Sequence, residues 1–354
     1  MFFEERYIPR TLNRWLSTGL GKLGASAVLS IVFALVLLVL HLIYPTGTGS
    51  RLLLPVQVGN KRCYINEFGR VVLRTRYDTA GPFVNGRAVV SLDGRYGYIE
   101  RDGELAIPTI FSSAEPFSGL RALVHTGGTP QFINSYGSVV FEPATDEVRS
   151  FSDGFAWFRS EGKCGFYGIE GKVVIPPQFA DARDFSEGMA AATIDGSNWG
   201  FVGSDGKWLL EPAWKAAGSF REGVAPAAMG PLFGFTGTDG RFAIAPQFEA
   251  AREFCDSLAA IKQDGKWGYV NHKGVVIIRP QFEEARDFCH GRAVVRMDGA
   301  WGVVDEAGSF VAPPHYLWID DFAQELASYR SPRAAPGRYG YMDRSGNSVW
   351  SATR

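Results

Sequence analysis

The sequence predicts an all-β repeat array of three-stranded antiparallel meanders, preceded by one N-terminal transmembrane α-helix. Three observations lead to this fold class. Glycine and aromatic markers recur every 34 or 35 residues along most of the 354-residue chain. Gly (42 residues) and Phe (26 residues) are abundant, which favours short strands joined by tight turns. Near the N-terminus, residues 23–50 contain no Asp, Glu, Lys or Arg.

The uncharged segment contains the apolar stretch GASAVLSIVFALVLLVLHLIY, residues 24–44. About 20 apolar residues span the hydrocarbon core as a helix, which pairs all of its backbone polar groups internally. A cleaved signal peptide is the alternative, but the run is long, the leader has 22 residues and no A-x-A site follows. We expect a leader (1–22), a retained transmembrane helix (23–44) and a flexible linker (45–50).

The charges around the apolar stretch set its expected orientation. The leader carries four basic and two acidic residues, and three basic residues follow the stretch at 51, 61 and 62. The positive-inside bias is therefore slight. As for a signal anchor, we expect the N-terminus in the cytoplasm and the repeat domain outside it.

Residues 51–354 are expected to form about nine repeats of 34–35 residues, defined by three series of markers. A glycine opens each unit: Gly59, Gly94, Gly128, Gly162, Gly196, Gly230, Gly265, Gly299 and Gly337. A second glycine follows: Gly69, Gly103, Gly137, Gly171, Gly206, Gly240, Gly274, Gly308 and Gly346. The third marker is Phe83, Phe117, Phe151, Phe185, Phe220, Phe254, Phe288 and Phe322. A unit of this size cannot bury its own apolar face, so neighbouring units must stack.

Each unit is expected to contain three short strands and a crossover. Asp264-Gly265 separates two apolar runs, and this dipeptide is typical of the primed turn of a β-hairpin. The second glycine makes the next reversal. Since proline cannot donate to the ladder, it is expected to end the third strand, at residues 143, 177, 212, 246, 280 and 314. The remaining segment, such as residues 281–291, lacks a period of two, and we expect its Phe282 and Phe288 to fill the gap between units.

The recurring KWGYV, NWGFV and AWGVV, each followed by a Gly turn, a Val/Ile run, Pro and F-x-x-A-x-x-F, resemble the WG (tryptophan-glycine, or KWG) repeats of bacterial proteins. The resemblance covers about residues 51–350 and is best over residues 163–304, while Arg62-Cys63 and Pro130-Gln131 depart from it. It implies an interaction module that is often exported or membrane-anchored, with no common enzymatic reaction. The array is expected to be an open superhelix or propeller-like, and variable copy number in the family favours an open or loosely ring-like superhelix.

Six arginines are the candidate contacts with a partner. Arg183, Arg252 and Arg286 recur at one repeat position, each followed by an acid, and could bind a periodic ligand. The alternative is a solvated row of ion pairs between neighbouring units, which adds little stability. The final hairpin is longer by four residues, and insertions in repeats map to loops that often bind; it contains Arg330, Arg333 and Arg338. The alternative there is an insertion tolerated near a terminus.

Other residue patterns point away from catalysis and cofactors. The WG aromatics could form a sugar-stacking ladder, but we favour packing between units, because aromatic side chains mostly supply buried area. Cys255 and Cys289 occupy the same slot in consecutive units, and we expect free thiols unless their Cα atoms lie within about 7 Å. The four cysteines form no CxxC pair, so neither zinc nor another cofactor is expected.

Together, these observations predict a membrane-anchored, non-enzymatic scaffold that presents its repeats outside the cytoplasm and binds another protein at the cell envelope. A cell-envelope glycan-binding module is the alternative. An enzyme is the least supported function, because the repeats show no convergent acid, base or nucleophile. The net charge of −1, with both signs interspersed, gives no reason to expect nucleic acid as a partner.

Overall fold

The computed structural model describes residues 52–58, 61–145, 147–323, 325–332 and 339–351. The chain divides into two units, Met1–Ser50 and Arg51–Arg354, and all described residues belong to the second. The predicted leader, the transmembrane helix at 23–44 and the linker therefore lie outside the described residues. Within the described residues, no helix is long and apolar enough to cross a membrane.

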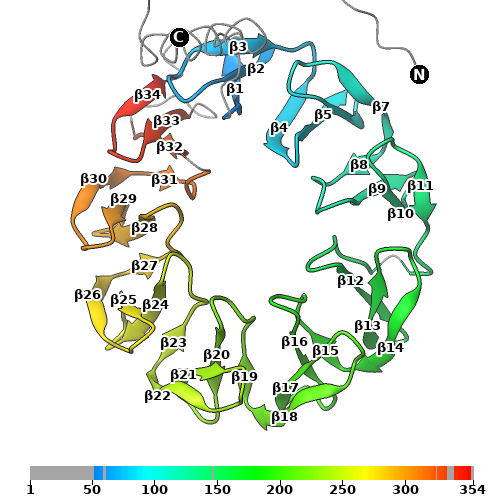
Figure 1. Ribbon diagram of the computed structural model, residues 1–354. Coiled ribbons are helices and arrows are strands. Elements are labelled where there is room, and N and C mark those ends of the chain that lie inside the picture. Colours follow the sequence, from blue (N-terminus) through cyan, green and yellow to red (C-terminus); the bar gives the residue numbers. More distant parts are fainter. Residues whose placement is uncertain (1–51, 59–60, 146, 324, 333–338, 352–354) are drawn as a thin grey trace, which may run out of the picture. The chain divides into compact units, whose positions relative to one another are not determined.

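The described residues form 34 strands in nine antiparallel sheets, numbered 1 to 9 in chain order (Figure 1). Sheets 1 to 3 contain β1 (Leu54–Val58), β2 (Lys61–Ile65), β3 (Val71–Arg74); β4 (Thr79–Val84), β5 (Arg87–Leu92), β6 (Arg95–Ile99), β7 (Leu105–Phe111); β8 (Ser113–Ala114), β9 (Ala122–Thr126), β10 (Thr129–Ile133) and β11 (Val139–Phe141). Sheets 4 to 6 contain β12 (Phe155–Ser160), β13 (Lys163–Gly168), β14 (Val173–Phe179); β15 (Asp181–Ala182), β16 (Ala190–Thr193), β17 (Trp199–Val202), β18 (Trp208–Trp214); β19 (Ala216–Ala217), β20 (Val224–Ala228), β21 (Phe233–Gly237) and β22 (Phe242–Phe248). Sheets 7 to 9 contain β23 (Ala250–Ala251), β24 (Leu258–Gln263), β25 (Lys266–Asn271), β26 (Val276–Phe282); β27 (Glu284–Ala285), β28 (Arg292–Met297), β29 (Ala300–Asp305), β30 (Phe310–Tyr316); β31 (Trp318–Ile319), β32 (Leu326–Arg330), β33 (Gly340–Asp343) and β34 (Ser348–Ser351).

Most sheets have one strand more than the sequence predicts. In the part of the chain that the structure describes, seven sheets have four strands, and only sheets 1 and 4 have three. The additional strand comes from the segment expected to be a crossover. In sheet 8, Glu284 and Ala285 pair with Arg296 and Val295 of β28. Outside sheet 2, whose β4 is longer, these additional strands have two residues, which are too few to display a period of two. The prediction of three-stranded meanders was therefore wrong for these sheets.

The outer strand of a typical sheet contains a bulge at its proline. Trp267 pairs with Phe282 and Tyr269 with Ile278, so two steps along β25 face four steps along β26. Pro280 lies inside this bulge, and the prediction that proline ends the strand was wrong here and at residues 177, 212, 246 and 314. Of the six strands concerned, only β11 ends before its proline, Pro143. At the edge of a sheet, the missing N–H of proline removes no ladder hydrogen bond.

The WG glycine is required by this bulge. A Cβ on Gly268 would lie 2.5 Å from the carbonyl oxygen of Ile278 and 2.6 Å from the nitrogen of Pro280. Sheet 1 departs from the WG pattern and lacks the bulge at this position: Cys63 pairs with Arg74 and Tyr64 with Leu73, and the register shifts only after Tyr64. A side chain is therefore tolerated at this position where the outer strand has no bulge opposite it.

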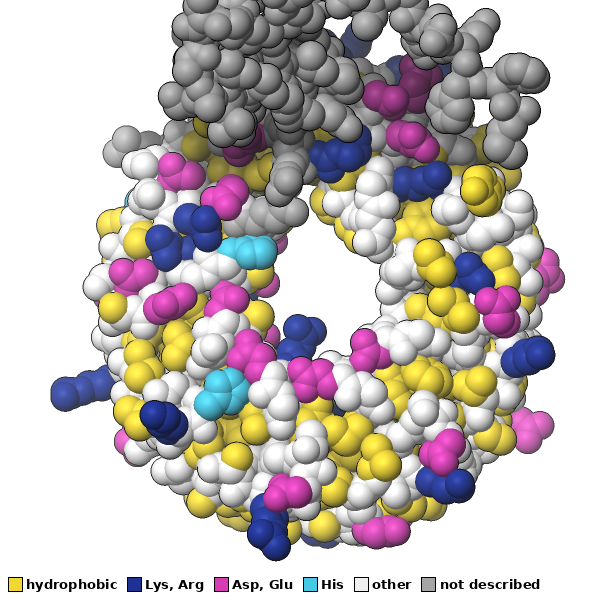
Figure 2. All heavy atoms as spheres, viewed as in Figure 1, with side chains coloured by type: hydrophobic (Ala, Val, Ile, Leu, Met, Phe, Trp, Pro, Cys, Tyr) yellow, Lys and Arg dark blue, Asp and Glu magenta, His cyan; other side chains and the backbone are white. Residues whose placement is uncertain are grey.

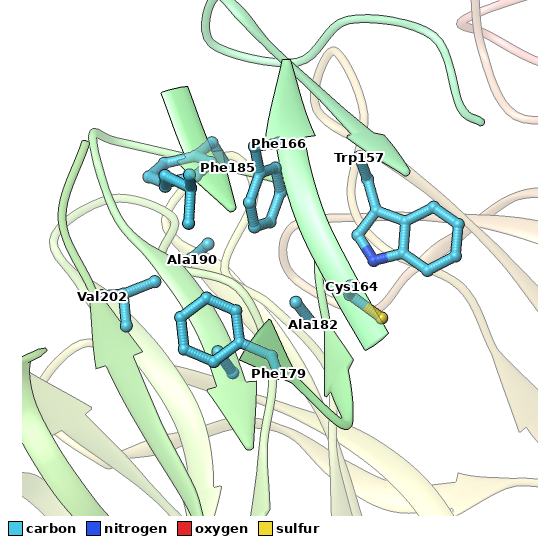
Figure 3. Close-up of a cluster of buried hydrophobic side chains, with 10 residues drawn as sticks. Trp157, Cys164, Phe166, Phe179, Ala182, Phe185, Ala190 and Val202 are labelled. Carbon is cyan, nitrogen blue, oxygen red and sulfur yellow. The ribbon is translucent and has the colours of Figure 1, made fainter. Parts of the chain in front are cut away.

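The hydrophobic core is divided among the gaps between neighbouring sheets. Phe288, which is fully buried, meets Tyr269 of the preceding sheet edge to face, with ring centroids 4.7 Å apart. Phe282 belongs to the same cluster. Figure 3 shows the equivalent gap between sheets 4 and 5, where Phe185 lies beside Phe166. The predicted role of these phenylalanines, filling the gap between units, is confirmed.

The ring of sheets is closed (Figure 1). One cluster combines Leu52 and Leu54 at the start of sheet 1 with Leu326 and Tyr341 of sheet 9. The hydroxyl of Tyr341 donates a hydrogen bond to the carbonyl oxygen of Pro55, at 2.9 Å. The propeller-like alternative is therefore confirmed and the favoured open or loosely ring-like superhelix was wrong: the domain is a β-propeller with nine blades in the described residues.

Candidate interaction surface at the seams between sheets

The three repeated arginines lie next to the inner strands of their sheets. Arg183, Arg252 and Arg286 directly follow β15, β23 and β27, which face the centre of the ring in Figure 1. Figure 2 shows that this centre is open and that Asp and Glu side chains gather along part of its border. Arg183 and Arg252 are exposed, and Arg286 is half-buried.

Each of these arginines lies over the tryptophan of its own WG pair. The guanidinium carbons lie 5.6, 5.5 and 4.8 Å from the ring centroids of Trp199, Trp267 and Trp301, respectively. Such cation–π contacts contribute roughly 0.5–1 kcal/mol at exposed sites. Arg183 also donates from Nε to the carbonyl oxygen of Ala217 in the next sheet, at 2.7 Å. The WG tryptophan thus supports an arginine that spans a seam.

Among the described residues, the arginine row forms ion pairs across two of the seams. Arg286 lies 3.4 Å from Asp321 of the next sheet, and Arg149 lies 3.3 Å from Asp184. Arg149 belongs to the row but was missed in the sequence, because Ser150 replaces the acid that follows the other three. Its guanidinium lies 4.0 Å from the ring centroid of Trp157.

A second row of contacts, formed by acidic turn residues, was also missed. The carboxylate of Glu187 accepts hydrogen bonds from the backbone nitrogens of Glu222 and Gly223, at 2.6 and 2.9 Å. Asp256 accepts from Gly291 in the same way, at 2.8 Å. The signal in the sequence is an acid two residues after the marker phenylalanine, commonly followed by glycine.

The position directly after the marker phenylalanine holds a hydrogen-bond donor toward the next sheet. The hydroxyl of Ser186 donates to the carbonyl oxygen of Phe220 at 2.7 Å, and the thiol of Cys289 donates to that of Phe322 at 3.2 Å. Cys255 occupies the same slot, and both thiols are free. Burial raises the pKa of both thiols, which lowers their thiolate fraction and their reactivity.

Asp287, the acid that follows Arg286, lies in a half-buried position that disfavours its charged form. Burial raises its pKa, although the nearby Arg252 acts in the opposite direction. Its Oδ1 atom is buried without a hydrogen-bond partner in the described part of the chain. Ionising this carboxylate therefore costs stability.

The WG aromatics pack between sheets. Trp267 and Trp301 are half-buried and lie against the clusters of their seams. Because arginine covers one side of each ring, a sugar would have to displace the guanidinium to stack there. These contacts agree with the packing interpretation.

The final hairpin is only partly described. Arg330 is half-buried at the end of β32, while Arg333 and Arg338 lie outside the described residues. The Nε atom of Arg330 is buried and has no hydrogen-bond partner within the described ranges. Across the described residues, no group of three or more His, Cys, Asp or Glu side chains is placed to hold a metal ion.

Comparison with known proteins identifies the repeat and the fold. The family model described as "WG containing repeat" matches residues 64–96, 96–128, 132–164, 165–197, 199–230, 233–267, 267–299 and 301–330. No curated protein matches the sequence. Among solved structures, the chain is similar to a eukaryotic initiation factor, with 10% identity and a TM-score of 0.58, over 83% of this chain and 93% of that one. BamB from Moraxella catarrhalis has 11% identity and a TM-score of 0.40, over 72% and 93% of the two chains. At such identities the likeness concerns the fold alone.

Proposed function

Since the chain belongs to the WG-containing repeat family, we propose that it is a membrane-anchored, non-enzymatic scaffold whose propeller lies outside the cytoplasm and binds another protein. The closed ring supports this role, because its sheets hold exposed turns on a rigid frame where binding residues can vary. The apolar stretch at residues 24–44 supports the anchor, since its length matches the hydrocarbon core.

The observation that carries the proposal is the arginine row beside the central opening. Arg183 and Arg252 are exposed, yet each is held over a tryptophan ring. A guanidinium fixed in this way loses less side-chain freedom on binding an acidic group than a mobile one does. We propose that these two residues contact the partner, together with Arg286 and the arginines of the final hairpin.

Affinity capture from crosslinked membranes tests this function. The full chain should recover one reproducible protein partner, and the double substitution of Arg183→Gln with Arg252→Gln should reduce its recovery about tenfold, which equals roughly 1.4 kcal/mol of binding free energy. Lys207→Gln is the matched control, because Lys207 is 84% exposed in the turn just before β18, whereas Arg183 follows β15 at the other edge of the same sheet. Failure to recover a reproducible partner, or equal loss in the control, would contradict the proposal.

A glycan of the cell envelope is the alternative ligand. The half-exposed edges of Trp267 and Trp301 favour it, because indole rings stack on sugars through their apolar faces. The arginine that covers each ring argues against it, so protein remains the preferred partner.

A further inference from the structure

Three hydrophobic side chains project from turns in the first third of the ring. Among the described residues, the most exposed large hydrophobic side chains are Tyr136 (85%), Phe68 (69%) and Leu120 (66%). The next is Leu209, at 57%. Exposure to water of three large apolar groups costs free energy unless something covers them.

The strand pairing places all three at one face of the ring. Phe68 follows the end of β2, and Tyr136 follows the end of β10, the equivalent strand of sheet 3. Leu120 lies just before β9, whose first residue, Ala122, pairs with Ile133 at the end of β10. Leu120 and Tyr136 therefore lie at the same end of sheet 3, and Phe68 lies at the equivalent end of sheet 1. Figure 1 shows these sheets in the same sector of the ring.

The chain enters the ring at this face. Leu54 pairs with Ile65, the last residue of β2, and Ile65 pairs with Val71. The entry point and the turn that holds Phe68 thus lie at the same end of sheet 1. Only seven residues, 45–51, separate Tyr44, the end of the apolar stretch, from Leu52. Fully extended, they reach about 28 Å at most.

From this arrangement we propose that this face of sheets 1 and 3 docks on the lipid bilayer, with Phe68, Leu120 and Tyr136 inserted at the level of the headgroups. The inference rests on the proposed anchor at residues 24–44. Aromatic side chains are favoured at this depth, because the ring meets apolar chains and a hydroxyl meets water. Arg70, which is exposed beside Phe68, lies where lipid phosphates would be.

The spacing of the three groups favours lipid over a folded protein. Sheet 2 lies between sheets 1 and 3, and its residue at the position equivalent to Phe68 and Tyr136 is the exposed Asp102. A specific protein interface has a contiguous apolar core, whereas a fluid membrane surface receives each projecting group separately. The hydrophobic groups in hairpin turns at the opposite face, such as Ile194 and Met229, are 54% and 53% exposed and lie on sheets 5 and 6, away from the entry point.

Quenching by spin-labelled lipids tests the docking in the full chain. The chain is reconstituted in nanodiscs that contain nitroxide-labelled lipids, and bimane is attached at Tyr136→Cys. Cys255→Ser and Cys289→Ser remove the accessible thiols, and serine is chosen because Ser186 occupies the same repeat position. Cys63 and Cys164 are 0% exposed and should stay unlabelled. Ile194→Cys is the matched control. Because docked groups lie roughly 5–10 Å inside the interface, bimane at 136 should be quenched at least about twofold more than at 194.

The outcomes separate the docking from the anchor. Equal quenching at 136 and 194, or none at either, in a chain that alkaline washing leaves in the membrane overturns the docking and leaves the anchor standing. A chain that does not enter nanodiscs overturns both. A third outcome is that the cysteine introduced at position 136 is protected from labelling in cells but bimane at 136 is not quenched in nanodiscs. This result would assign the face to a protein partner and overturn the lipid assignment.

Discussion

Gly268→Ala tests the explanation of the WG motif. Its added methyl group would lie 2.5 Å from the oxygen of Ile278, 2.6 Å from the nitrogen of Pro280 and 2.9 Å from the carbonyl carbon of Arg279. All three are backbone atoms of the bulge, so no side-chain rotation relieves the overlap. The bulge must move away from β25, against the packing of Phe282 in the seam.

The size of the effect follows from this geometry. Overpacking typically lowers the free energy of unfolding by about 1–3 kcal/mol. Because the added methyl group meets three backbone atoms, we expect Gly268→Ala to lie at the upper end, about 3 kcal/mol. For a ring of roughly 300 residues, the entropy of unfolding is about 0.6 kcal/mol/K, so the melting temperature should fall by about 5 °C.

Thermal unfolding of the full chain in detergent, followed by circular dichroism, measures the change. Gly230→Ala is the matched control, because its added Cβ meets no atom within 4 Å and its φ is not in the left-handed region. The control should remain within about 0.5 kcal/mol of the parent. Equal melting temperatures for the two variants would refute the account of the WG glycine.

Three further predictions concern the seams. Burial raises the pKa of Asp287, so the folded state holds its proton more tightly than the unfolded chain, in which an Asp side chain has a pKa of about 3.9. The stability that the bound proton contributes is therefore lost as the pH rises. Asp287→Asn should therefore raise the melting temperature at pH 7, and the gain should vanish near pH 4; a gain independent of pH would contradict the assignment. Tyr341→Phe removes the shorter of the two hydrogen bonds that Pro55 accepts from sheet 9 and should cost about 1 kcal/mol in urea unfolding, whereas Tyr136→Phe, on an exposed ring, should cost nothing measurable. Tryptophan fluorescence should not change when envelope polysaccharides or peptidoglycan fragments are added, and a saturable change would favour the glycan alternative.

The repeat and its turns could be predicted because they depend on local backbone chemistry. Asp264 and Gly265 both have positive φ, 50° and 73°, as the predicted primed turn requires. The inner strand could not be predicted in the same way, since Glu284 and Ala285 are too short a segment to show a strand pattern and are extended only by pairing with β28. Closure was also inaccessible, because the pattern of one unit does not define the rotation between sheets, which depends on packing such as that of Leu52 against Tyr341.

The candidate site was predicted in part. Repetition made Arg183, Arg252 and Arg286 visible, but not their positions over tryptophan, since the two residues lie some 15 positions apart in the chain. The acidic turn residues were missed although Glu187 and its equivalents recur at a fixed offset from phenylalanine. An acid before glycine in a turn is commonplace, and its contact with the next sheet arises only in the closed ring.

Limited proteolysis of intact spheroplasts tests most directly whether the propeller is anchored and lies outside the cytoplasm. External proteinase K should cut the linker at residues 45–50 and release the ring of sheets as a folded fragment. Without protease, the full chain should stay in the membrane through alkaline washing. Release of the intact chain by the wash would contradict the anchor, and a chain that protease reaches only after lysis would contradict the location outside the cytoplasm.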